Sequence, residues 1–284
     1  MRCFWLGVLA VLAGCGDVPE EEEEATSGEL VVTCPEHDNC DQRFCEQVPI
    51  EGGQFEMGSN HPPHEDTSWT SGDERPRHHV YVDPFCIDKY EVTLKRYESC
   101  VDAGVCTPDG LLWRNISTTV NHYPPECYGD LNACKNRAVN GKNYGQAKDY
   151  CEWIGGRLCT EAEWERAANG PGPDRRRNPW GGAAPSSDLV NIPSTGTGFV
   201  EEVDDYPDGV SAEGVFNLAG NVYEWVEDAY DLYADSTESE PLINPSNPPE
   251  SADVQAVGRG SCFFTEPHHT VAERTIFDQT FDWG

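Results

Sequence analysis

The chain has 284 residues, of which 37% are hydrophobic and 10% aromatic, which is enough apolar material for one sizeable core or two small ones. Its 19 Lys and Arg residues face 51 Asp and Glu residues, so the formal net charge is −32 at pH 7. A charge of this sign repels phosphate backbones, which excludes nucleic acid as a partner. An acidic chain suits an exported protein that binds divalent cations, although an ordinary solvated acidic surface is the simpler explanation.

The first fifteen residues have the pattern of a bacterial lipoprotein signal. Arg2 supplies a positive charge, residues 4–12 form a short apolar run, and the sequence Leu-Ala-Gly-Cys ends at Cys15. The run is too short for a membrane-spanning helix. The four residues resemble a lipobox, after which residues 1–14 are removed as the signal peptide and Cys15 is acylated; an ordinary secretory signal is the alternative. We expect a lipid anchor at Cys15 in the cell envelope, outside the cytoplasm.

Two further segments precede the main domain. Residues 15–31 contain a run of five glutamates and then small polar residues, which predict a solvated tether. Residues 32–47 hold three cysteines in a polar stretch that is too short to fold by burial alone, so we expect a small knot pinned by disulfides. The 13 cysteines of the chain are not arranged as CxxC pairs, which favours disulfides in an oxidising compartment over a zinc site. Residues 48–284 are expected to form one domain.

Three helices are predicted in this domain, over 93–103, 144–154 and 160–169. The first follows a threonine N-cap, the second ends at a Gly-Gly pair, and the third opens with a Thr-x-x-Glu capping box. Beyond residue 169 the chain has many turns and little helical periodicity, so we expect short strands and long ordered loops. Loops of this length need disulfides or metal ions to stay ordered.

Six segments of the domain carry recognisable motifs. They are Val48–Ser59, Pro84–Thr93, Gly156–Glu165, Pro179–Gly181, Phe216–Trp225 and Arg259–Ser261. In this order they resemble the successive signatures of the formylglycine-generating enzyme (sulfatase-modifying factor) family. The resemblance implies an α+β fold class, a variant of the C-type lectin fold with little regular secondary structure.

Active members of this family are oxidases that hold copper between two cysteines after an Arg-Gly-Gly-Ser segment and convert a substrate cysteine to formylglycine. When Arg259–Ser261 is laid on that segment, Phe264 and His269 stand where the resemblance expects the two cysteines. Neither is a thiol, and the single sulfur of Cys262 cannot supply a two-thiolate copper site. We therefore expect no catalytic residues of the family's usual kind and no copper.

Iron-dependent relatives in ergothioneine synthesis hold their iron through histidines, partly from an extra helical domain with no counterpart in this sequence. His61 and His64 are separated by two prolines, so they cannot share a helical face. The pairs 78–79 and 268–269 would point to opposite sides of a strand. We expect all of them to be surface histidines.

The resemblance also implies structural calcium, which would order loops without a catalytic role. The family's ligands, two side-chain oxygens and two backbone carbonyls, are matched by Asn217, Gly220, Val222 and Glu224. Such a set suits a hard cation, and an Asn/Gly turn with an exposed glutamate is the alternative.

A second calcium site of the family is matched more weakly, by Asn191, Ile192, Thr197 and Phe199. Thr197 replaces an aspartate, which removes the main charged ligand and leaves this site in doubt.

The cysteines do not pair completely. Without Cys3 and Cys15, eleven of the 13 cysteines remain, so one is left over. The resemblance pairs Cys151 with a cysteine in a closing strand that would begin where this sequence stops. We therefore expect either a native chain that continues past Gly284 or a domain without its last strand, with Cys151 as the orphan of the present sequence. Local bridges are available between Cys100 and Cys106 and between Cys127 and Cys134. Partners for the cysteines at 86, 159 and 262 cannot be assigned.

The leading hypothesis is an exported lipoprotein that uses this fold as a non-catalytic, calcium-stabilised module, either for binding a protein or glycan ligand or for envelope assembly. Its binding surface would be formed by loops around Trp180, Trp225 and residues 263–264. The alternative is that these aromatic residues belong to the core, and for Trp180 and Trp225 this is the favoured interpretation.

The alternative hypothesis is an enzyme, a formylglycine-generating oxidase or related metal-dependent oxidoreductase acting on a protein cysteine or a small thiol. Ser261, Cys262, His268 and His269 would be the first residues to test. A third alternative is an accessory subunit of a sulfatase system.

Overall fold

The computed structural model describes residues 9–10, 15–17, 33–36, 39, 44–60, 73–108, 123–127, 130–171, 176–251, 253–264 and 270–279. Within these residues the chain forms short helices and short strands joined by long loops. This arrangement confirms the predicted α+β class with little regular secondary structure. No helix in the described part of the chain has the length and apolar character needed to cross a membrane.

The strands form three small sheets. The order in the first is β1 (Leu9–Ala10), β7 (Tyr223–Ala229), β9 (Ala256–Arg259) and β10 (Thr275–Phe277). The order in the second is β2 (Gly16–Asp17), β6 (Phe85–Asp88) and β3 (Gln47–Ile50). The order in the third is β4 (Gly53–Met57), β5 (His78–Val82) and β8 (Leu242–Ile243). Most neighbouring strands run antiparallel; β1 with β7 and β5 with β8 are the parallel pairs.

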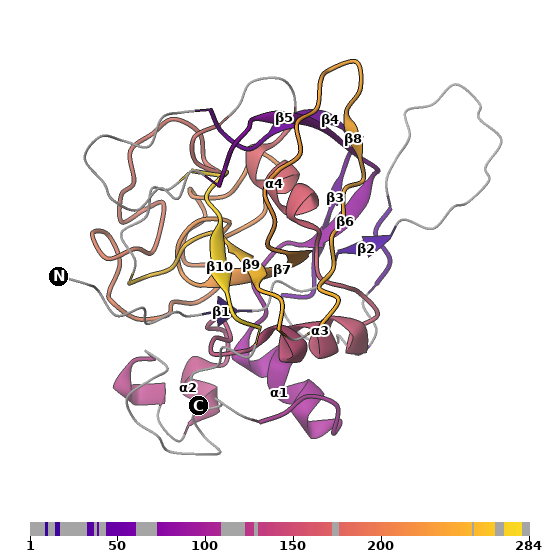
Figure 1. Ribbon diagram of the computed structural model, residues 1–284. Coiled ribbons are helices and arrows are strands. Elements are labelled where there is room, and N and C mark those ends of the chain that lie inside the picture. Colours follow the sequence, from indigo (N-terminus) through magenta and orange to yellow (C-terminus); the bar gives the residue numbers. More distant parts are fainter. Residues whose placement is uncertain are drawn as a thin grey trace.

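The helices are α1 (Leu94–Asp102), α2 (Leu131–Cys134), α3 (Tyr144–Trp153) and α4 (Glu161–Asn169), with a 3-10 turn at Pro125–Cys127. Figure 1 shows α1, α2 and α3 gathered at one end of the molecule, while α4 packs against β4, β5 and β7. The three predicted helices are confirmed, including the cap at Thr93 and the capping box of Thr160 and Glu163. The sequence did not predict α2, because one helical turn is too short to show a periodic pattern.

The central strand β7 separates the two largest hydrophobic clusters. Trp225 packs in one cluster with Tyr97, whereas the next residue, Val226, packs in the other with Trp164. Successive residues of a strand point to opposite faces, so β7 is covered on both sides. A charged side chain on this strand, such as Glu224, is therefore removed from water.

The structure gives partners to several cysteines. The expected local bridges Cys100–Cys106 and Cys127–Cys134 are both formed, and Cys151 is a buried thiol. Cys34 is bonded to Cys86 in β6. The segment 32–47 is therefore tied to the main domain by a disulfide, and Cys45 in the same segment is also disulfide-bonded.

Cys15 is also part of the folded body. It is buried, and its sulfur is bonded to that of Cys159, which differs from the lipid thioether expected from the sequence. The preceding segment contributes β1, which pairs with β7. Removal of residues 1–14 and the tether character of 15–31 stay predictions, and most of the tether lies outside the described residues.

Candidate metal centre

The loop that precedes β7 is tightly wound. Asn217, Gly220 and Asn221 have positive φ angles of 53°, 78° and 59°, and glycine and asparagine adopt this left-handed conformation at the least cost. A Cβ atom on Gly220 would lie 2.6 Å from the carbonyl oxygen of Asn191, so glycine is required there. The backbone geometry of the loop therefore accounts for its Asn-x-x-Gly-Asn sequence.

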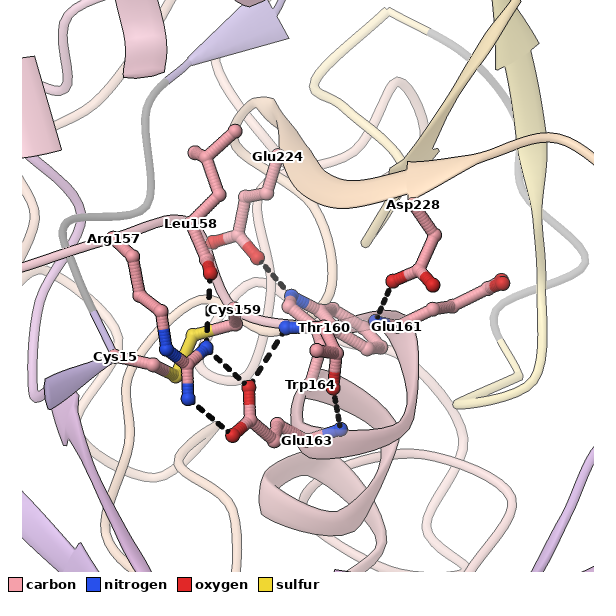
Figure 2. The surroundings of a disulfide bond; sticks show 10 residues. All are labelled: Cys15, Arg157, Leu158, Cys159, Thr160, Glu161, Glu163, Trp164, Glu224 and Asp228. Carbon is pink, nitrogen blue, oxygen red and sulfur yellow. Dashed lines mark hydrogen bonds and ion pairs between the residues drawn. A yellow bond between two sulfur atoms is a disulfide. The ribbon is translucent and has the colours of Figure 1, made fainter. Parts of the chain in front are cut away.

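Glu224, the second residue of β7, carries a fully buried carboxylate. Its Oε2 atom accepts a 2.5 Å hydrogen bond from Nε1 of Trp164 on α4 (Figure 2). Its Oε1 atom is buried and has no hydrogen-bond partner among the described residues. Burial raises the pKa of Glu224 well above its ordinary value, and the charge of nearby Glu91 raises it further. The exposed glutamate of the alternative interpretation is thereby excluded.

Glu91, just before α1, is a second buried carboxylate that sequence reasoning missed. Its Oε2 atom accepts hydrogen bonds of 2.8 Å from Nδ2 of Asn217 and 2.7 Å from Nδ2 of Asn221. Its Oε1 atom also has no hydrogen-bond partner in the part of the chain that the structure describes. Burial raises the pKa of Glu91 to about 8, although the two amide hydrogen bonds lower it. The only signal in the sequence was an acidic residue between Tyr90 and Val92 in one of the family motifs.

Two neighbouring buried carboxyl groups must either hold protons or face a cation, because an isolated buried carboxylate costs several kcal/mol. Asn217 donates both amide hydrogens, to Glu91 and to the carbonyl of Val203, so its Oδ1 atom remains for another partner. This oxygen, the carboxylate of Glu224 and the carbonyls of Gly220 and Val222 form the expected ligand set. Orphaned buried oxygens of this kind fit a hard divalent cation such as calcium, and Glu91 adds a second negative charge beside it.

The second predicted set, Asn191, Ile192, Thr197 and Phe199, also contains an orphaned oxygen, because Oδ1 of Asn191 is buried without a hydrogen-bond partner among the described residues. Its two backbone carbonyls, however, already accept hydrogen bonds. The carbonyl of Ile192 already accepts hydrogen bonds from the amides of residues 195 and 196. The carbonyl of Phe199 accepts one from Nδ2 of Asn191.

A side chain supplies the positive charge near this second set. Thr197 contacts the carboxylate of Glu201, and the other oxygen of that carboxylate lies 2.8 Å from Nη1 of Arg137. The guanidinium of Arg137 thus neutralises the acidic group that would otherwise attract a metal ion. The carboxylates near the two predicted sets thus differ, because that of Glu201 is paired with a cation, whereas Glu91 and Glu224 each keep an unpartnered oxygen among the described residues.

The segment after β9 holds the positions of the family's copper ligands. Ser261 has a φ angle of 61°, in the region that favours glycine. Phe264 and His269, the positions expected to correspond to the two cysteines, carry no sulfur that could bind cuprous copper.

Two of the four residues predicted for the enzyme alternative, Ser261 and Cys262, belong to the described part of the chain. Phe264 is half-buried, with its ring 5.1 Å from that of Phe263 in an edge-on contact. Cys262 is a buried thiol. His268 and His269 lie outside the described residues.

The histidine pair in β5 is only partly as expected. His78 and His79 point to opposite faces of the strand, as predicted. However, His78 is buried, with Nδ1 2.9 Å from the carbonyl oxygen of Pro76, so the expectation of a surface histidine is wrong for this residue. His61 and His64 lie outside the described residues.

The aromatic residues considered for a binding surface belong mainly to the core. Trp225 and Phe263 are buried in the same cluster. Trp180 is partly buried, and its Nε1 atom donates to the carbonyl of Ala183 at 3.0 Å. The interpretation as core residues is therefore correct for Trp225 and Phe263.

Known proteins resemble this chain in sequence and structure. The formylglycine-generating enzyme of Thermomonospora curvata is 28% identical over 273 residues, which cover 80% of this chain and 87% of that protein. The serine/threonine-protein kinase pkn1 of Chlamydia pneumoniae is 34% identical over 223 residues, which cover 77% of this chain but only 33% of the kinase. The solved structure of PvdO from Pseudomonas aeruginosa has a TM-score of 0.57 and 25% identity, and the match covers 88% of this chain and 95% of that chain.

Residues 35–280 match the profile of the family described as "Sulfatase-modifying factor enzyme 1-like domain". The match includes all six motifs and most of the cysteine-containing segment that precedes them. Together with the structural likeness, it confirms the family and the fold that the motifs predict. The chain belongs to the sulfatase-modifying factor family.

Proposed function

We propose that this chain is an exported, non-catalytic member of the family, stabilised by one calcium ion and used for binding or for assembly in the cell envelope. The observation that carries the proposal is the pair of buried carboxylates, Glu91 and Glu224, each with an unpartnered oxygen. A cation between the loop at Asn217, Glu224 of β7 and Glu91 would hold together parts of the fold that are far apart in sequence.

The residues after β9 support the absence of oxidase activity. The two positions expected to correspond to copper ligands, Phe264 and His269, carry no sulfur, and the nearby Cys262 is buried. A thiol removed from solvent is a poor partner for a metal ion or a substrate thiol. The enzyme hypothesis would have to rest on His268 and His269, which lie outside the described residues.

The net charge of −32 indicates the kind of ligand that such a module binds. An acidic surface attracts a basic partner and repels an anionic one. A protein with a basic face is therefore favoured over an anionic glycan, and association should weaken as salt is added.

An activity assay tests the non-catalytic part of the proposal. The full chain is supplied with calcium and reduced copper, together with a peptide that bears the Cys-x-Pro-x-Arg sulfatase motif. Formylglycine is detected by the accompanying loss of mass. We expect no conversion above a control without protein, and conversion would establish the oxidase alternative instead.

A further inference from the structure

Cys15 is held in the fold by its backbone as well as by its sulfur. Its amide donates a 2.9 Å hydrogen bond to the carbonyl of Arg157, and its carbonyl accepts one of 3.2 Å from the amide of Arg157. The next two residues form β2, which pairs with β6. The disulfide to Cys159 thus joins two segments that already lie side by side, although the two cysteines are 144 positions apart.

The environment of Cys159 is equally well defined (Figure 2). The guanidinium of Arg157 makes hydrogen bonds of 2.7 and 2.8 Å to the two carboxylate oxygens of Glu163. Glu163 also accepts from the amide of Thr160 in the capping box of α4. The carbonyl of Cys159 accepts a 2.8 Å hydrogen bond from the amide of Glu227 on β7. These contacts fix the residues on both sides of Cys159, so its sulfur faces Cys15 in a set position.

A lipid anchor at Cys15 is incompatible with this position. A cysteine sulfur forms one bond besides that to Cβ, so it is either in a disulfide or in a thioether. Cys15 is fully buried in the cluster that contains Phe85 and Trp164. Acyl chains on this residue would have to pass through that cluster to reach a membrane.

We propose that Cys15 of the folded, exported protein is oxidised to the disulfide with Cys159 and carries no lipid, so the amino-terminal segment is a staple of the fold and not a membrane anchor. The two thiols lose two protons and two electrons as the sulfur–sulfur bond forms. A disulfide of a thiol oxidoreductase, or a small-molecule disulfide, accepts them and is reduced to two thiols. This inference does not depend on the calcium site.

Peptide mapping of the full chain, expressed with its own first residues in a Gram-negative host, tests this proposal. Free thiols are blocked with N-ethylmaleimide before lysis, and the exported protein is digested with trypsin without reduction. Cleavage after Arg157 and Arg166 releases residues 158–166, in which Cys159 is the only cysteine. We expect this peptide to be cross-linked to Cys15 and to be released by reduction.

The Cys100–Cys106 bridge provides the internal control, and only fractions in which it is oxidised are scored. A blocked Cys159 in such a fraction, or a Cys15 that carries the mass of a diacylglycerol thioether, would overturn the proposal.

A variant pair gives a second readout. Cys159→Ser should make the Cys15 thiol reactive toward the blocking reagent or available for lipid, whereas Cys106→Ser should leave the Cys15–Cys159 link intact. Free thiols of both samples are blocked in denaturant, and the disulfides are reduced afterwards. If the Cys15 peptide of Cys159→Ser then has the same mass as that of the wild type, the disulfide was absent and the proposal is wrong.

Discussion

The indole Nε1 atom of Trp164 donates a 2.5 Å hydrogen bond to Oε2 of Glu224, and this bond leaves Oε1 of the same carboxylate for another partner. Trp164 lies on α4 and Glu224 on β7 (Figure 2). Because the indole is a donor only, it orients the carboxylate without competing for a cation. The helix thus positions the charged ligand of the proposed calcium site.

Replacing Trp164 with phenylalanine should weaken calcium binding. The substitution removes the donor to Glu224 but keeps an aromatic ring in the core, and a hydrogen bond to a charged group contributes about 2 kcal/mol. Calcium titration calorimetry and thermal unfolding measure the two effects. Trp180→Phe is a matched control, because it removes an indole hydrogen bond to the carbonyl of Ala183 and not one to a carboxylate. Equal losses of calcium affinity in both variants would contradict the positioning role of Trp164.

The stability of the calcium-free protein should fall as the pH rises from about 4.5 to about 8. Burial raises the pKa of Glu91 from 4.5 to about 8, so between these values the folded state binds more protons than the unfolded state, and the free energy of unfolding decreases with pH. Calcium competes with these protons, so its affinity should increase over the same range and its binding should release protons. Calorimetry in buffers of different ionisation enthalpy counts the protons. A calcium affinity that is independent of pH would show that no buried carboxyl group loses a proton when calcium binds.

Calcium should bind with a stoichiometry of one per chain. In the second predicted set, Arg137 already supplies the positive charge for Glu201 at 2.8 Å. Equilibrium dialysis followed by metal analysis measures the stoichiometry. Arg137→Gln should destabilise the protein by about 1–3 kcal/mol, because it leaves Glu201 without its cation. Two bound calcium ions in the unaltered chain would show that the second set is a metal site after all.

Removing the Cys15–Cys159 disulfide should cost more stability than removing a local one. In the chain-entropy account, a bridge that spans 144 positions stabilises by about 5 kcal/mol and one that spans 6 positions by about 2 kcal/mol. Denaturant unfolding measures the free energy of unfolding of two double variants, Cys15→Ser with Cys159→Ser and Cys100→Ser with Cys106→Ser. A smaller loss for the longer bridge would indicate that the amino-terminal segment contributes little to the fold.

The sequence was most informative where the determining contacts are local. The capping box of Thr160 and Glu163 lies within four residues, and the bridge between Cys100 and Cys106 spans 6 positions. Both were predicted correctly. The motif around Asn217 could be matched to the family's calcium-binding pattern because the positions of that pattern lie within one short loop and the start of the next strand; calcium binding itself stays a prediction.

The parts that could not be predicted depend on contacts between distant segments. Glu91 meets Asn217 across 126 positions, and its place in a family motif does not show that its carboxylate lies near that of Glu224. The pairing of Cys15 with Cys159 likewise depends on Cys15 lying beside Arg157 in the folded chain. His78 was expected at the surface, because nothing in the neighbouring sequence shows that the distant residue Tyr233 packs against it. The centres of the two rings are 4.6 Å apart.

The most direct test of the account is calcium titration calorimetry at pH 8 on the full chain and on two variants of β7. The wild type should bind one calcium ion, and Glu224→Gln should abolish binding because it removes the charged ligand. Glu227→Gln, on the same strand but with its carboxylate bonded to Ser246 near the surface, should bind as the wild type does. A wild type that binds no calcium, or a Glu224→Gln variant that binds it normally, would contradict the central claim that these buried carboxylates form a metal site.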